Sequence, residues 1–216
     1  EISTRDWSSD VCSSDLVVTP RTYIASVSCV VTAGATPIFA DVDPNSGNLT
    51  AKTIASVLTP KTKAIIVVHL AGYPCDMDEI NQLAKEYNLT VIEDAAHALG
   101  AKYKGNNIGT ISDFTSFSFQ AIKHLTTGDG GLLTCKKESD AKVIKRLRWF
   151  DIDRENSVPS ILGEREYDIT NVGFKYHMND IAASIGLGNL TIIDEKLSKI
   201  KKIANFYDEQ DRKSTR

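Results

Sequence analysis

The segment 64–70, with the sequence AIIVVHL, limits the possible folds of this chain more than any other stretch. It is apolar and rich in β-branched residues along almost its whole length. This composition is typical of a parallel strand that other elements cover on both faces. The chain is therefore expected to build a parallel sheet with helices packed on each side.

Short apolar runs alternate with amphipathic segments on both sides of this strand. We expect strands to lie or end at 17–20, 37–42, 64–70, 89–93, 114–119 and 131–135. The helices expected between them are one capped by Thr22, one opened by Thr50, one with a capping box of Asp76 and Glu79, and one over 139–150. This alternation predicts an α/β fold with a mostly parallel, three-layer α/β/α sheet and right-handed crossovers.

The part of the chain after residue 150 departs from this pattern. Residues 151–168 are irregular, polar and charged, which is typical of a surface or active-site loop. From Asn179 onward, apolar residues recur at roughly helical spacing as far as Ile200. We therefore expect one long helix from Asn179 onward, with one domain over 17–190 and the connection toward a second domain over 191–210.

Both termini have sequences that look foreign to the rest of the chain. Residues 6–16 can be written in codons that match a DNA sequencing adapter, and codons for 211–216 match the reverse complement of part of that adapter. We expect 1–16 and 211–216 to be non-native, adapter-derived tails, so that the domain is truncated at both ends. The alternative is a disordered tail rich in Ser and Asp at the first end and a basic tail at the other.

The charge and cysteine content exclude several classes of function. The formal net charge of -3 and the isoelectric point near 5.8 give no electrostatic basis for binding nucleic acid. No apolar run is long enough to span a bilayer, so no membrane association is expected. The cysteines lack paired metal-ligand spacing, which predicts reduced thiols, a cytoplasmic location and no metal site; they are Cys12, Cys29, Cys75 and Cys135.

Two polar side chains that could act in chemistry follow predicted strands. Asp94 comes directly after the strand at 89–93, and Lys123 comes shortly after the strand at 114–119. Ligands of parallel α/β sheets bind beyond the carboxyl ends of the strands, where both residues are expected. Asp94 could pair with the nitrogen of a pyridine ring, and Lys123 could form a Schiff base with an aldehyde. The alternatives are a helix N-cap for Asp94 and a solvated surface charge for Lys123.

Two further residues extend the same interpretation. Ser118 could bind a phosphate together with nearby backbone amides, or it could be an ordinary strand residue. His97 could contact a cofactor ring, or it could be a buried histidine with one satisfied nitrogen. The glycines of 128–131 lack the ending of a nucleotide P-loop and indicate a tight turn. A carboxylate, a hydroxyl and an amine in this order describe a site for pyridoxal phosphate (PLP).

Several ordered motifs resemble the DegT/DnrJ/StrS-type family of PLP-dependent sugar aminotransferases, which have the type I (aspartate aminotransferase) fold. The matching stretches are TPRTY at 19–23, GATPIFADVD at 34–43, PKTKAI at 60–65, VHLAG at 68–72, EDAAH at 93–97, and residues 117–131. The resemblance implies that 17–190 is part of the PLP-binding large domain. It also implies that the family's phosphate loop, which lies upstream, and its small domain are missing from this chain.

The resemblance assigns roles to seven residues. It implies Lys123 as the Schiff-base lysine, Asp94 as the partner of the pyridine nitrogen and Ser118 as a phosphate ligand. His97 would lie near the ring hydroxyl, and Tyr23 would stack on the ring. The segment 174–177 matches a region that reaches the cofactor of the neighbouring subunit in family dimers, so Lys175 and His177 are cross-subunit candidates. Many members carry Asn-Tyr-Arg there, and this chain does not.

The function implied by the resemblance is the transfer of an amino group, with glutamate as the expected donor, to a keto carbon of a nucleotide-linked deoxysugar. The product would enter surface polysaccharide or glycosylated metabolite synthesis, and the enzyme would be a homodimer. With the phosphate loop absent, the fragment itself is expected to bind cofactor poorly and to be inactive. The alternatives are a PLP-dependent sugar dehydratase of the same family, in which a histidine replaces the lysine, and a non-catalytic regulatory homologue.

Overall fold

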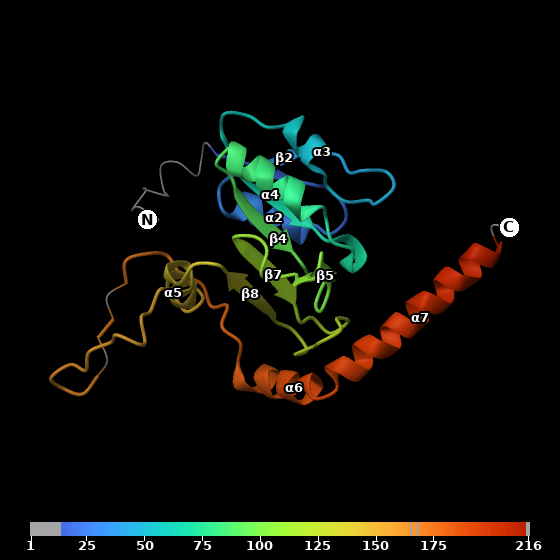
Figure 1. Cartoon of the computed structure of the whole chain (residues 1–216). Helices are drawn as coiled ribbons and strands as arrows, with labels where there is room; N and C mark the ends of the chain where they lie inside the picture. Colours follow the sequence, from blue (N-terminus) through green and yellow to red (C-terminus); the bar gives the residue numbers. More distant parts are fainter. Residues whose placement is uncertain (1–13, 165, 168, 215–216) are drawn as a thin grey trace.

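The computed structural model describes residues 14–164, 166–167 and 169–214 (Figure 1). Its centre is a six-stranded sheet with the strand order β2-β1-β3-β4-β7-β8. The strands are β1 (Asp15–Val18), β2 (Thr36–Phe39), β3 (Thr62–Val68), β4 (Thr90–Asp94), β7 (Phe114–Ser118) and β8 (Gly131–Cys135). The first five are parallel, and β8 runs antiparallel to β7. A hairpin of β5 (Lys102–Tyr103) and β6 (Asn106–Asn107) stands apart from this sheet.

The helices are α2 (Ala25–Thr32), α3 (Ala51–Ala55), the short 3-10 turn η2 (Leu70–Gly72), α4 (Met77–Glu86), α5 (Glu138–Leu147), α6 (Asp180–Leu190) and α7 (Ile193–Ser214). Of these, α3 and α4 pack on one face of the sheet and α2 packs on the other. Because side chains alternate along a strand, β3 supplies both layers. Ile65 packs with Ile54 of α3 and Ile80 of α4, whereas Ile66 packs on the other face with Val30 of α2. The prediction of a mostly parallel α/β/α sheet is confirmed.

The ends of the sheet differ in detail from what the sequence predicted. Strand β1 begins at Asp15, whose backbone nitrogen donates to Lys61 and whose carboxylate accepts from Thr59 at 2.7 Å. Residues 15 and 16, expected as part of a tail, thus pair within the sheet, and residues 1–13 lie outside the described residues. Helix α7 likewise continues through residues 211–214. The adapter origin of both ends stays a prediction.

Three helix predictions are wrong at their starts or in their length. Helix α2 begins after Ile24, so Thr22 does not cap it. Asp76 precedes α4 without forming a capping hydrogen bond, because its carboxylate accepts from the hydroxyl of Tyr103 instead. The single helix expected from Asn179 is divided into α6 and α7 near Thr191, and α7 projects away from the sheet (Figure 1).

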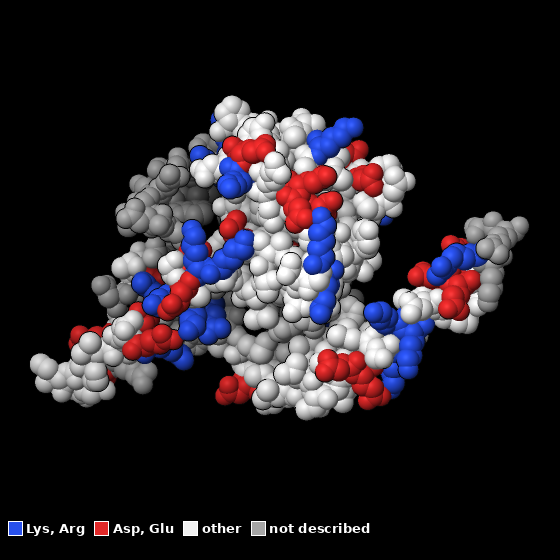
Figure 2. All heavy atoms as spheres, in the orientation of Figure 1, with Lys and Arg blue, Asp and Glu red and all other residues white. Residues whose placement is uncertain are grey.

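The surface carries both signs of charge. Figure 2 shows lysine and arginine intermixed with aspartate and glutamate over the displayed face. On α7, Glu195 and Lys199 form an ion pair at 2.6 Å. Within the part of the chain that the structure describes, no helix has both the length and the apolar character required to cross a membrane.

Candidate cofactor site

The carboxyl ends of β4 and β7 bring two predicted site residues to one edge of the sheet. Asp94 is the last residue of β4 and is aligned with Ser116, two residues before Ser118 at the end of β7. Both side chains are half-buried. The loops that follow these strands carry His97 and Lys123, so four of the seven predicted residues belong to this edge.

The carboxylate of Asp94 is held by two donors. Ser26 of α2 donates its hydroxyl to Oδ2 at 2.6 Å, and the backbone nitrogen of Ala96 donates to Oδ1 at 3.1 Å. The backbone oxygen of Asp94 also accepts from the nitrogen of His69 at 3.1 Å. No helix begins at Asp94, so the N-cap interpretation is wrong. Its side chain instead accepts from Ala96 in the turn that follows the strand. The sequence analysis missed Ser26, whose only signal was its place in the first helix of the sheet domain.

Lys123 lies in the loop between β7 and β8 and is half-buried. Its backbone nitrogen donates to Gln120 at 2.9 Å, which fixes a turn just beyond the end of the strand. Burial lowers the pKa of the adjacent His124, and the nearby Lys196, His97 and Lys123 act in the same direction. His97 is exposed, so the interpretation as a buried histidine is wrong.

Ser118 has a hydroxyl hydrogen that donates to no described residue. Its oxygen accepts from the backbone nitrogen of Gln120 at 3.3 Å. The glycines that follow lie in close contact with their surroundings, since a Cβ on Gly130 would meet the hydroxyl of Thr127 and one on Gly131 would lie 2.7 Å from the backbone oxygen of Phe117. Ser118 can thus donate to a phosphate group at the sheet edge.

The structure does not bring the other three predicted residues into contact with this group. Tyr23 lies before α2 with 73% of its side chain exposed. Lys175 forms an isolated bridge with Trp149, and the ring of His177 packs edge-on against Trp149 with the centroids 3.9 Å apart.

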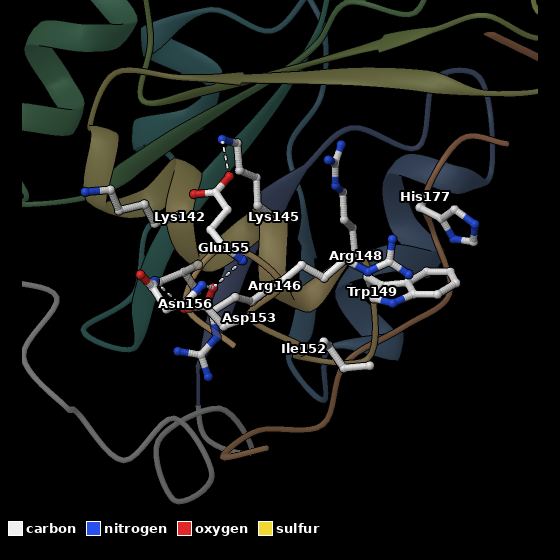
Figure 3. Close-up of a pocket in the computed structure, with 12 residues that line it drawn as sticks. Lys142, Lys145, Arg146, Arg148, Trp149, Ile152, Asp153, Glu155, Asn156 and His177 are labelled. Carbon is white, nitrogen blue, oxygen red and sulfur yellow. Dashed lines mark hydrogen bonds and ion pairs between the residues drawn. The ribbon is translucent and has the colours of Figure 1, made fainter. Parts of the chain in front are cut away.

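His177 lines a hollow of about 620 Å³ beside α5 (Figure 3). Most of its cations already have partners: Arg146 pairs with Asp151 at 3.0 Å, and Lys145 pairs with Glu155 at 3.3 Å. The guanidinium of Arg154 lies 4.4 Å from the centroid of the Trp149 ring. The hollow is therefore lined by charged side chains that mostly have partners, and neither Asp94 nor Lys123 is among the residues that line it.

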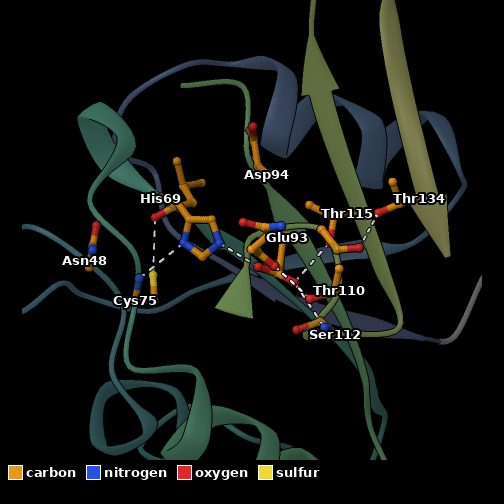
Figure 4. Close-up of polar contacts among 12 residues, drawn as sticks. Asn48, His69, Cys75, Glu93, Asp94, Thr110, Ser112, Thr115 and Thr134 are labelled. Carbon is orange, nitrogen blue, oxygen red and sulfur yellow. Dashed lines mark hydrogen bonds and ion pairs between the residues drawn. The ribbon is translucent and has the colours of Figure 1, made fainter. Parts of the chain in front are cut away.

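A buried polar network lies on the opposite face of β4 from Asp94 (Figure 4). Glu93 and His69 are both fully buried, with 2.7 Å between Oε2 and Nε2. The backbone nitrogen of Cys75 donates to Nδ1 of His69, so Nε2 carries the hydrogen and donates to Glu93. Oε1 of Glu93 accepts from the nitrogen of Ser112 at 3.1 Å and from the hydroxyl of Thr115 at 3.0 Å.

Cysteine, histidine and glutamate side by side resemble a nucleophilic triad, but the geometry excludes that function. The thiol of Cys75 points to the backbone oxygen of Val68 rather than to the histidine. Burial, with the charge of Glu93 adding to it, raises the pKa of Cys75 to about 12. A thiol that stays protonated is a poor nucleophile, so the network is structural and ties β3, β4 and β7 together just behind the site.

The donors and acceptors at the sheet edge fit PLP. A carboxylate can accept about four hydrogen bonds, and the half-buried Asp94 uses two of them within the described structure, which leaves room for a protonated ring nitrogen. Lys123 supplies an amine and Ser118 a free donor at the same edge. The described residues contain no cluster of three or more His, Cys, Asp or Glu side chains that could hold a metal ion.

Comparison with known proteins also indicates an aminotransferase. The model of the DegT/DnrJ/EryC1/StrS aminotransferase family matches residues 9–213. An uncharacterized protein of Methanocaldococcus jannaschii, MJ1066, is 46% identical over 197 residues, which are 91% of this chain and 51% of that protein. GDP-perosamine synthase of Caulobacter vibrioides is 40% identical over 196 residues, covering 91% of this chain and 50% of that enzyme.

Solved structures share the fold as well. The PLP-form of the putative sugar aminotransferase Spr1654 from Streptococcus pneumoniae superposes with a TM-score of 0.79 at 33% identity, over 91% of this chain and 53% of that one. The chain thus spans about half the length of the relatives it matches.

Proposed function

The chain belongs to the DegT/DnrJ/EryC1/StrS aminotransferase family, and on that premise we propose that the whole protein is a PLP-dependent sugar aminotransferase. It transfers an amino group, with glutamate as the donor, to a keto carbon of a nucleotide-linked deoxysugar. The observation that carries this proposal is the placement of Asp94, Ser118 and the loop of Lys123 at the carboxyl edge of β4 and β7.

Each of these residues has a distinct task in the proposed reaction. Bound PLP supplies a ring that can accept electrons from the substrate carbon. The carboxylate of Asp94 accepts a hydrogen bond from the ring nitrogen and keeps it protonated. Nζ of Lys123 would hold the cofactor covalently and, when free of it, would take and return the proton at the substrate carbon. The hydroxyl of Ser118 donates to the phosphate and fixes the position of the ring.

The remaining assignments belong to a homodimer. We place His97 near the ring hydroxyl and Tyr23 against the ring face, while Lys175 and His177 reach the cofactor of the neighbouring subunit. Residues 17–190 then form part of the large domain, and 191–210 connect it to the small domain. The three described cysteines are free thiols, which supports a cytoplasmic enzyme. The product supplies surface polysaccharide or glycosylated metabolite synthesis.

The test is the absorption spectrum of the full-length protein with PLP, compared with that of Lys123→Ala. The wild-type protein should show the band of a covalently held cofactor, and the variant should lose it because the amine of Lys123 is the group assigned to the aldehyde of PLP. Lys136→Ala is the matched control, since Lys136 follows β8, which runs antiparallel to β7 and so ends at the opposite edge of the sheet. An unchanged band in Lys123→Ala would contradict the role of Lys123.

A further inference from the structure

Ser26 makes the shortest side-chain contact to the proposed partner of the ring nitrogen. It lies in the first turn of α2, only 6% of the residue is exposed, and its hydroxyl donates to Oδ2 of Asp94 at 2.6 Å. The two residues are 68 positions apart in the sequence. The contact therefore joins the helix that follows β1 to the functional end of β4.

The two donors to Asp94 fix the plane of its carboxylate. The backbone nitrogen of Ala96, in the turn that follows β4, donates to Oδ1, and the hydroxyl of Ser26 donates to Oδ2. Because each oxygen is held by a different donor, the carboxylate cannot rotate freely about its Cβ–Cγ bond. With both oxygens engaged once, the remaining lone pairs have set directions. A ring nitrogen must be met along one of these directions, because hydrogen bonds weaken steeply when the angle is poor.

A role in holding the helix does not explain the hydroxyl. Helix α2 docks on the sheet through apolar contacts of Val30, Val27 and Val18. Ser26 does not cap the helix, which has no side-chain capping hydrogen bond at its start. Alanine at this position would favour the helix more than serine does. The buried hydroxyl of Ser26 does not stabilise the helix, and it donates to Asp94. This indicates that it acts at the site.

We propose that Ser26 is a positioning residue that orients the Asp94 carboxylate toward the nitrogen of the PLP ring. This inference rests on the proposed role of Asp94. In Ser26→Ala the carboxylate keeps only the hydrogen bond from Ala96 and can rotate, so the ring nitrogen meets it in a poorer geometry. In Ser26→Thr the hydroxyl stays on the same Cβ atom and the orientation is preserved.

The experiment uses full-length protein and two readouts, the dissociation constant for PLP and the midpoint of a pH titration of the bound cofactor's absorption. Ser26→Ala should weaken PLP binding about tenfold, the equivalent of one hydrogen bond to a charged group, and should move the midpoint. Ser26→Thr should behave as the wild type. Ser28→Ala is the matched control, because Ser28 is an exposed serine of the same helix whose hydroxyl donates to the backbone of Ala25. Circular dichroism confirms that each variant is folded.

Two outcomes would overturn the inference, and Asp94→Asn separates them from failure of the proposed function. Wild-type values for Ser26→Ala, while Asp94→Asn changes both readouts, would show that Asp94 acts without Ser26. Equal losses in Ser26→Ala and Ser26→Thr, with no movement of the midpoint, would show a packing role. If Asp94→Asn itself changes neither readout, the role of Asp94 fails and the inference fails with it.

Discussion

At the end of β4, the buried carboxylate of Glu93 accepts three hydrogen bonds from described residues. The donors are Nε2 of His69, the backbone nitrogen of Ser112 and the hydroxyl of Thr115. Burial acts to raise the pKa of Glu93, but the hydrogen bonds from His69, Thr115 and Ser112 hold it below its ordinary value. The residue next to Asp94 is therefore an ionised group of β4 whose partners come from the end of β3 and from the start of β7 with the loop before it.

Glu93→Gln should lower the free energy of unfolding by about 3 kcal/mol. The amide of glutamine has donor hydrogens on one side, so at least one of the three donors would face another donor in the buried network. Urea denaturation of this chain measures the effect. Glu79→Gln, at an exposed position of α4, is the control and should change stability by less than about 0.5 kcal/mol. Equal stability of the two variants would show that the network contributes nothing.

At the scale of elements, the turn after β3 packs closely against the turn after β4. Gly72 has a positive φ of 84°, and a Cβ atom there would lie 2.7 Å from the backbone oxygen of His97. Gly105, in the β5–β6 hairpin, has a similar φ of 87°, but a Cβ atom there would meet nothing within 4 Å. The two glycines thus share the backbone requirement and differ only in the close approach.

Gly72→Ala should therefore cost more stability than Gly105→Ala. Both substitutions pay the strain of a left-handed conformation, about 1–2 kcal/mol, but only the first must also move the backbone of His97. We expect an additional loss of about 1–2 kcal/mol in chemical denaturation and, in the full-length protein, weaker PLP binding for Gly72→Ala alone. If the two variants unfold at the same denaturant concentration, the turns are not tightly packed.

The whole molecule shows which features a sequence can predict. The parallel sheet could be predicted from local composition, because a strand such as β3 carries apolar residues on both faces in its own sequence. Asp94 and Ser118 followed from strand ends, which topology places at one edge. The contacts of Ser26 with Asp94 and of His69 with Glu93 were missed because they join residues 68 and 24 positions apart, through packing that no local pattern records. The break between α6 and α7 was missed because apolar spacing continues across it.

Two buried carboxylates should dominate the response of the whole molecule to acid. Glu93 is fully buried, and Asp151 is 1% exposed. Burial acts to raise the pKa of Asp151, but donors from Asn171, Thr170 and Arg146 hold it below its ordinary value. Both pKa values are thus lower in the folded chain than in the unfolded chain. The stability that these groups supply is fully present above the unfolded values, near 4.5 for Glu and 3.8 for Asp, and is lost as the pH falls toward the folded values.

The free energy of unfolding should consequently change little through these groups between pH 7 and about pH 5 and should fall steeply below about pH 4.5, because the unfolded chain then binds protons that the folded chain excludes. The double variant Glu93→Gln with Asp151→Asn should be less stable at pH 7 but should lose stability less steeply in acid, since neither replaced side chain titrates. Urea titrations at a series of pH values measure both slopes. Because each slope reports the difference in bound protons between the two states, parallel curves for the two proteins would mean that acid unfolds the chain through other carboxylates.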